Sequence, residues 1–243
     1  MNGIIVIICA ILPAVALVLY IYLKDKYQRE PLGQIMKGML YGVISALMAI
    51  LVASGLSMIG LVPAEINSVN TAFGTAFFGA AIPEEMAKLL MLWLLLRHNK
   101  YYDEYVDGIV YAVCVGMGFA GFENILYLIS ADDWHSVAVS RAIFSVPGHY
   151  MFAVTMGYFY SMVHYGIHRK RNMWALFIFP VLFHGVFDAL LMSGQVMSEW
   201  AAEMTIIAFL AFFVLVQKRV RKAIERQLVR DAEKQNETQG IIF

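Results

Sequence analysis

The sequence predicts an all-α, polytopic membrane protein with a single bundle of about seven transmembrane helices. Of the 243 residues, 60% are hydrophobic and only 15% are charged, whereas a soluble domain carries about 25% charged residues. The formal net charge is zero, which gives no indication of nucleic-acid binding. Apolar runs of spanning length, about 20 residues each, follow one another along most of the chain. The lipid bilayer is therefore the expected environment.

Seven runs are long and apolar enough to span a membrane. They lie near residues 3–23, 35–59, 73–96, 107–129, 138–163, 174–194 and 201–217. The first run lacks the basic start of a signal peptide, and we interpret it as a retained span. The fourth contains Gly108, Gly116, Gly118 and Gly121, a pattern typical of closely packed membrane helices. We expect residues 1–217 to form the membrane domain and residues 218–243 a charged cytoplasmic tail.

The basic residues predict the topology, because cytoplasmic loops contain an excess of lysine and arginine. All of the 18 basic residues except Lys88 and Arg141 lie in or beside the first, third and fifth connections or in the tail. The second, fourth and sixth connections contain none. This alternation predicts an N-terminus outside and a C-terminus in the cytoplasm. Arg141, near the outer end of its span, is expected to extend to the outer lipid headgroups.

The third run contains charged residues near its middle, in Pro83-Glu84-Glu85-Met86-Ala87-Lys88. A charge at that depth costs about 3 kcal/mol or more, so it usually faces a polar interior and serves a function. Glu84 and Glu85 precede Lys88 by four and three residues, which places the ammonium one helical turn from both carboxylates. The pattern indicates an acid/base site.

Ionisable residues on the next spans are candidate partners for this site. They are Glu123 on the fourth span, His149 on the fifth, and His184 and Asp188 one helical turn apart on the sixth. At a rise of about 1.5 Å per residue, these groups can meet in one layer between the bilayer centre and its outer half. A purely structural role is a poor explanation for seven such residues on four consecutive spans, since each carries a desolvation cost.

Two mechanisms of hydrolysis fit this set of residues. Glu123, His149 and His184 form a two-histidine, one-carboxylate set of the kind that binds catalytic zinc, with Glu84 or Glu85 as general base for water. Lys88 or Asp188 would then orient or support the ligands. Alternatively, a glutamate activates water without a metal, and the histidines stabilise the oxyanion.

The motifs resemble the PrsW family of bacterial intramembrane proteases. The resemblance rests on Glu84-Glu85-x-x-Lys88, Phe119-x-x-x-Glu123, the Pro-Gly-His ending at His149, and His184-x-x-x-Asp188, in this order across the spans. It implies a multi-pass endopeptidase of the bacterial inner membrane, distantly related to the CAAX-prenyl-protease/Abi group. It also implies a single-span membrane protein as substrate, of which an anti-sigma factor is the best-known kind, cut on its extracytoplasmic side.

We assign roles to these residues as a hypothesis. Glu85 would be the general base, with Glu84 sharing its proton or holding its geometry and Lys88 favouring the charged form of both. Glu123, His149 and His184 would bind a divalent metal, most simply zinc, with Asp188 as a supporting group or further ligand. Residues 1–217 would then be the protease domain.

Other functions would use the same buried charges. A proton- or ion-coupled transporter also contains carboxylates, lysine and histidine at mid-membrane, but it usually shows internal repeats, which we do not find. A retinal-type receptor would need a lysine that forms a Schiff base, whereas the one mid-membrane lysine, Lys88, is close to two glutamates. A non-catalytic scaffold gives no reason for the charges.

Overall fold

The computed structural model describes residues 3–240, with side chains for residues 3–237, and every regular element in that range is a helix. Five elements are unbroken α-helices: α1 (Gly3–Lys24), α2 (Leu32–Met58), α5 (Asp107–Ser130), α8 (Arg169–Ser193) and α9 (Glu199–Gly240). Two others are composite. One consists of α3 (Val69–Gly74), the π-helical segment η1 (Thr75–Ala81) and α4 (Ile82–Leu96). The second consists of α6 (Trp134–Ser140), the π-helical segment η2 (Arg141–Ser145) and α7 (Val146–His164). The predicted all-α bundle is confirmed.

Six helices within the described chain are long and apolar enough to cross a membrane: α1, α2, α5, α8, α9 and the composite helix 134–164. The composite helix 69–96 is not among them, because it contains the three charged residues Glu84, Glu85 and Lys88. Each of the seven predicted runs nevertheless corresponds to one helical stretch. Six spans therefore follow from length and composition, and a count of seven stays a prediction.

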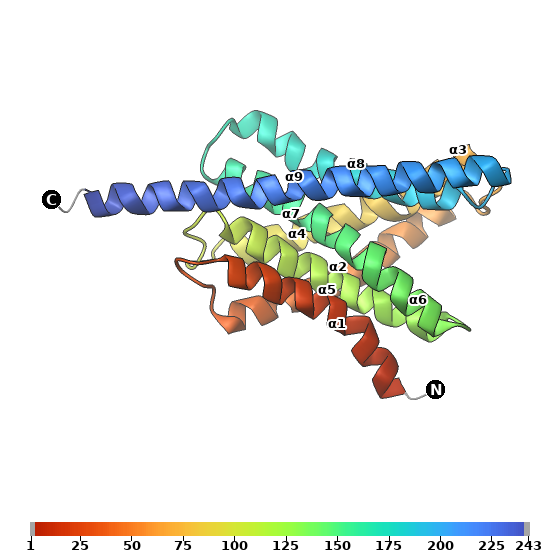
Figure 1. Ribbon diagram of the computed structural model, residues 1–243, viewed down its shortest axis with the longest axis horizontal. Coiled ribbons are helices and arrows are strands. Elements are labelled where there is room, and N and C mark those ends of the chain that lie inside the picture. The colour runs from red at the N-terminus through yellow and green to blue at the C-terminus, as the bar shows by residue number, and fades with distance from the viewer. Residues whose placement is uncertain (1–2, 241–243) are drawn as a thin grey trace.

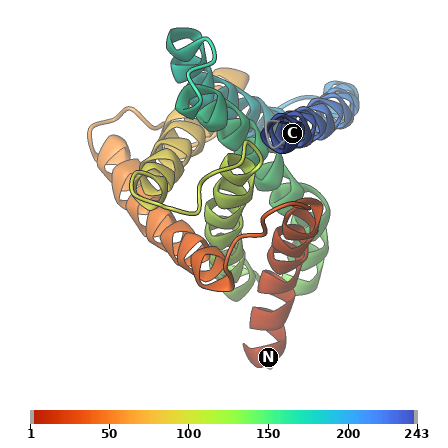
Figure 2. The ribbon, with the colours of Figure 1, turned by 90° about the vertical axis from the view of Figure 1, so that its left-hand side faces the viewer.

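Helix α5 lies at the centre of the bundle (Figure 2), and 17 of its 24 residues are buried. It packs against α1 and α2 on one side and against α7 on the other. Burial on all sides explains why the α5 sequence is apolar around its whole circumference, without one polar face. Glu123 therefore projects from the most enclosed helix of the protein.

Glycines allow the helices around α5 to approach closely. A methyl group on Gly118 would lie 2.0 Å from the main-chain oxygen of Met39 on α2, and one on Gly42 would lie 2.1 Å from the oxygen of Val115. On the opposite side of α5, a methyl group on Gly108 would lie 2.1 Å from Oγ of Ser161 on α7. These distances confirm the packing role predicted for the glycines of the fourth run.

Helix α9 runs along one side of the bundle and extends well beyond it at its C-terminal end (Figure 1). It packs against α7 and α8 through a narrow stripe that contains Phe209, Val216, Val220 and Ile224. The helix continues without interruption past residue 217, where the charged tail was predicted to begin. The last part of that tail, residues 241–243, lies outside the described residues.

We expect Gly118→Ala to destabilise the protein by about 1–3 kcal/mol, because the added methyl group would separate α5 from α2. Gly55→Ala is the matched control, since a methyl group there has no heavy atom within 4 Å and alanine is the better helix former. Thermal unfolding of both variants in detergent measures the difference. Equal midpoints for the two variants would contradict the close contact.

Candidate active site

Two π-helical segments precede the residues of the site. Segment η1 ends at Ala81, two residues before Pro83 and the Glu84-Glu85 pair that follows it. Segment η2 ends at Ser145, two residues before Pro147, which is followed by His149. A proline inside a helix lacks an N–H group and its ring collides with the carbonyl group four residues earlier. A π-helical turn widens the backbone there and is frequent at functional sites. Both composite helices, 69–96 and 134–164, therefore continue past their prolines, and the motif residues follow directly.

The ammonium group of Lys88 is the hub of the site. Its Nζ donates to Oε1 of Glu85 at 2.8 Å and to Oε2 of Glu84 at 3.2 Å, and lies 3.2 Å from Nδ1 of His149. Lys88 and Glu85 are buried, with 3% and 0% of their surface exposed. The ring of Phe119 covers the ammonium group at 3.8 Å, an arrangement that stabilises a desolvated cation. The predicted lysine–carboxylate contact is present.

His184 approaches the same carboxylates from α8. Its Nδ1 lies 2.9 Å from Oε1 of Glu85, and its Nε2 lies 3.2 Å from Oδ2 of Asp188. The next residue, Gly185, lets this helix approach η1, because a methyl group on it would lie 2.4 Å from the ring of Phe77. Asp188 and Glu85 hold the imidazole ring of His184 from opposite sides.

Glu123 contacts the ring nitrogen of His149 that faces away from Lys88. Its Oε2 lies 3.0 Å from Nε2 of His149 and forms an ion pair with Arg141. The guanidinium group of Arg141 also donates to Oδ1 of Asn124 at 2.6 Å and lies 3.9 Å from the centre of the Tyr127 ring. The prediction that Arg141 extends to the lipid headgroups was therefore wrong, because a partly buried carboxylate one helix away offers a stronger partner.

All seven residues predicted for the site come together in one hydrogen-bonded network: Glu84, Glu85, Lys88, Glu123, His149, His184 and Asp188. The sequence analysis missed Arg141 and Asn124, which complete its outer end. The signals were present in the sequence. Asn124 directly follows Glu123, and Arg141 is one of two basic residues that lie within the predicted spans and away from the basic connections.

A metal could be held by one group of donors within the network. One ligand atom each from Glu84, Glu85, His149 and His184 lie within 4.8 Å of one another. Two imidazole nitrogens and carboxylate oxygens are typical ligands of a catalytic zinc ion. In addition, Oε2 of Glu85 is buried without a hydrogen-bond partner. The donor set therefore fits a divalent metal, whereas Glu123 is outside this group and its predicted ligand role stays a prediction.

A cavity of about 210 Å³ connects the network with the outside of the bundle. Glu84 and Glu123 are its charged lining residues, and the remaining lining is mainly apolar side chains of α2 and α5 such as Ile50 and Phe122. Glu85 and Lys88 lie behind it, against a small internal void. Glu84 is thus the carboxylate of the pair that a molecule in the cavity can reach.

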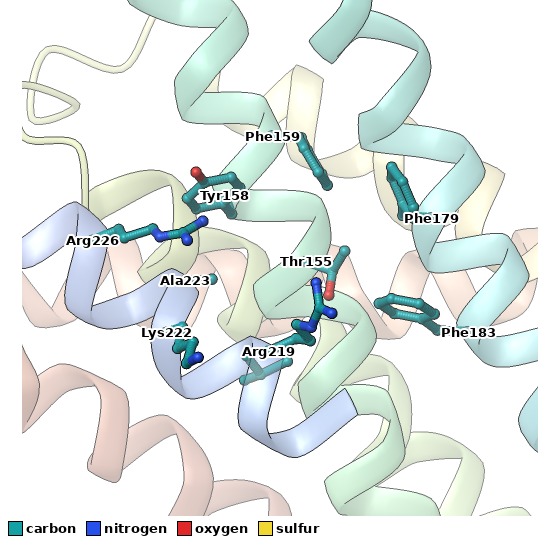
Figure 3. Close-up of a pocket in the computed structure, with 10 residues that line it drawn as sticks. Thr155, Tyr158, Phe159, Phe179, Phe183, Arg219, Lys222, Ala223 and Arg226 are labelled. Atoms are coloured by element: carbon teal, nitrogen blue, oxygen red, sulfur yellow. The ribbon is translucent and has the colours of Figure 1, made fainter. Parts of the chain in front are cut away.

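A larger cavity, about 450 Å³, lies between α7, α8 and α9 (Figure 3). It combines aromatic rings, including Phe159 and Phe179, with the basic side chains of Arg219 and Arg226. None of the seven predicted site residues lines it. Size alone therefore does not locate the active site in this protein.

The family model described as "PrsW family intramembrane metalloprotease" matches residues 30–216, which include the whole network. The chain belongs to the PrsW family. A protease from Geobacillus kaustophilus named "Protease PrsW" is 32% identical over 87% of this chain and 88% of its own length. Proteins of the same name from Bacillus subtilis and Clostridioides difficile are 30% and 32% identical, over 92% and 86% of this chain and 99% and 85% of their own. No solved structure matches the chain.

Membership of the PrsW family identifies the chain as an intramembrane protease. The apolar helices agree with a membrane location, as the sequence predicted. The transporter alternative finds no support, because the relatives compared here are all named as proteases. The family description as metalloproteases agrees with the histidine–carboxylate donor set.

We expect Arg141→Met to lower the stability of the folded state by about 1–3 kcal/mol, since it leaves the partly buried Glu123 carboxylate without its guanidinium partner. Arg97→Met is the control, because Arg97 is exposed and stacks on Trp93. Thermal unfolding of both in the same detergent compares them. A headgroup-facing Arg141 would instead make the two variants equal.

Proposed function

We propose that the protein hydrolyses a peptide bond in, or just outside, the membrane segment of a single-span membrane protein, on the extracytoplasmic side. The supporting observation is the meeting of buried acid, base and histidine groups from four helical stretches beside a cavity that reaches Glu84. Anti-sigma factors are the proposed substrate class, which rests on the family resemblance. Their cleavage would constitute regulated intramembrane proteolysis in the bacterial inner membrane.

The cavity supports the proposed side of cleavage. It is lined by residues from the C-terminal halves of α2 and α5, among them Ala53 and Tyr127. If seven spans begin outside, as the basic residues predict, both of these helix ends face the outer half of the bilayer. A substrate segment would then enter from the outer leaflet between α2 and α5.

We propose Glu84 as the group that removes a proton from the attacking water. It borders the cavity, while Glu85 is fully buried and is held by Lys88 and His184. This exchanges the roles suggested by the sequence, where Glu85 was the expected base. Once protonated, Glu84 could donate to the leaving amine. Glu85 would keep Lys88 charged and the ring of His184 in place.

The remaining residues would stabilise the negative charge that develops on the carbonyl oxygen. Lys88 and His184 present N–H groups or positive charge towards the position beside Glu84. Preorganised donors in a water-poor site are the largest single contribution in many enzymes. Glu123 and Asp188 would orient the histidines from behind.

A divalent metal, most simply zinc, would be held by Glu85, His149 and His184, which leaves Glu84 as the base. When bound, it would act as a Lewis acid that polarises the scissile carbonyl group. Binding requires the ammonium group of Lys88 to move away from these donors, because it already contacts Glu85 and His149. Lys88 would thus compete with the metal for them.

The domain division is also a proposal. Residues 1–217 would constitute the protease domain and residues 218–243 a cytoplasmic tail. Helix α9 crosses this boundary without a break, so residues 218–240 would be a rigid continuation of the last span.

We expect Glu84→Gln to reduce kcat by at least about 10²-fold, because the amide cannot accept the proton. The variant should unfold at nearly the wild-type temperature, since Glu84 is at the edge of the cavity. Glu85→Gln should lower stability by about 2–4 kcal/mol, because it removes a buried partner of Lys88. Cleavage of a reconstituted anti-sigma factor, with unfolding measured in parallel, distinguishes the two. If Glu84→Gln cleaves normally and a folded Glu85→Gln does not, Glu85 is the base.

We expect purified wild-type protein to contain close to one equivalent of zinc by elemental mass spectrometry, and His184→Ala to contain little. Chelation should remove both the metal and the activity. Cleavage that persists in metal-free protein would instead establish that glutamate activates water without a metal. His135→Ala is the control for unspecific binding, because His135 is exposed on α6.

A further inference from the structure

A second group of buried acidic residues lies where α1 ends and α5 begins. This is the end of the bundle opposite the cavity lined by Glu84 and Glu123. Asp25 directly follows α1, Glu104 lies in the loop between α4 and α5, and Asp107 is the first residue of α5. They are 0%, 3% and 0% exposed. One carboxylate oxygen from each lies within 4.8 Å of the others. We call these three residues the acidic triad.

Four of the six carboxylate oxygens of the acidic triad lack a hydrogen-bond donor. Both Asp25 oxygens, Oε2 of Glu104 and Oδ1 of Asp107 are buried without a partner. No lysine, arginine or histidine among residues 3–237 forms an ion pair with them. Burying a carboxylate without a donor or counter-ion is costly, and three adjacent carboxylates also repel one another. The fold therefore brings them together at a cost that something must offset.

The nearby basic side chains are directed elsewhere. The guanidinium nitrogen Nε of Arg29 donates to the main-chain oxygen of Asp25 at 3.2 Å, and Arg230 lies over the rings of Tyr105 and Tyr158. Lys234 donates to the main-chain oxygen of Asp103. Their charges moderate the local potential, but the carboxylate oxygens of the acidic triad still face one another.

The adjacent helix N-terminus does not satisfy the acidic triad. Asp231 of α9 accepts hydrogen bonds from the main-chain N–H groups of Tyr105 and Val106 at 2.6 and 2.9 Å. Oδ2 of Asp107 accepts from those of Asp103 and Glu104. These four N–H groups, which would otherwise attract an anion, are thus already paired. The inward-facing oxygens have no main-chain donor left.

We infer that the acidic triad is a binding site for a hard divalent cation, Mg²⁺ or Ca²⁺. Carboxylate oxygens without nitrogen or sulfur ligands are the set that these ions prefer. A cation would neutralise the carboxylates and supply the missing partner of four buried oxygens. Glu30 lies close enough to interact with Asp25, and its Oε1 is likewise buried without a partner; it is a candidate further ligand.

The electrostatics agree with this inference. Burial raises the pKa of Asp25 to about 6 and that of Glu104 to about 7. A cation would return these groups to their charged form.

The cation would hold together parts of the chain that are far apart in sequence. It would join the end of α1 to the loop before α5, and Asp231 attaches the same loop to the long helix α9. Gln235 of α9 also reaches Oε1 of Glu104, at 3.4 Å. The site lies on the predicted cytoplasmic side and is distinct from the histidine-containing donor set near Glu84.

The test is binding of Mg²⁺ and of Ca²⁺, each alone, to chelator-treated full-length protein in detergent, by titration calorimetry and by the thermal unfolding midpoint. We expect about one equivalent of one of these ions to bind and to raise the midpoint. Asp25→Asn should weaken binding by at least about tenfold. The loss of a hydrogen bond cannot explain this, because the carboxylate of Asp25 has no donor. Glu104→Gln is the second variant if Asp25→Asn fails to fold.

Two controls separate this site from others. Asp132→Asn removes an exposed carboxylate in the connection between α5 and α6 and should leave binding unchanged. His184→Ala alters the proposed active site and should also leave it unchanged. If neither ion binds or shifts the midpoint of the wild type, the inference is overturned, and the carboxylates hold protons instead. Equal loss in His184→Ala would overturn it too, because binding would then belong to the active site.

Discussion

The ammonium group of Lys88 is the interaction on which the interior of this protein depends. It contacts two carboxylates from its own helix and an imidazole from α7. Without it, Glu84 and Glu85 would be two negative charges at the centre of an apolar bundle, at a cost of several kcal/mol. The remaining contacts extend outward from this centre. Glu85 reaches His184, His149 reaches Glu123, and Glu123 reaches Arg141.

The same centre explains how a membrane interior can accommodate hydrolysis. Each charged group has a partner of opposite sign or a hydrogen-bond donor, so the network remains polar while the surrounding helices stay apolar. Glu84 is the member of the charged pair that a substrate can contact, since it borders the cavity between α2 and α5. Access therefore comes through a limited opening.

The all-helical fold, the positions of the helical stretches and the residues that meet in the network followed from the sequence because each leaves a strong local signal. Apolar length reveals helices in lipid, and a charge within such a run is rare enough to be informative. The pairing within the network did not follow. Whether Arg141 turns towards lipid headgroups or towards Glu123 depends on how α5 and the composite helix 134–164 pack, which residue spacing does not encode. Likewise, Glu84 and Glu85 look equivalent until the cavity shows which one is accessible.

The π-helical segments also affect how the sequence of these helices must be interpreted. A π-helical turn contains roughly one residue more than an α-helical turn, and each residue rotates an α-helix by about 100°. Side chains after η1 or η2 are thus out of phase with those before it. A helical wheel drawn through residues 73–96 as one regular helix would assign Glu84 to the wrong stripe relative to Phe73, which precedes η1. In such helices the apolar periodicity has to be evaluated separately on the two sides of the insertion.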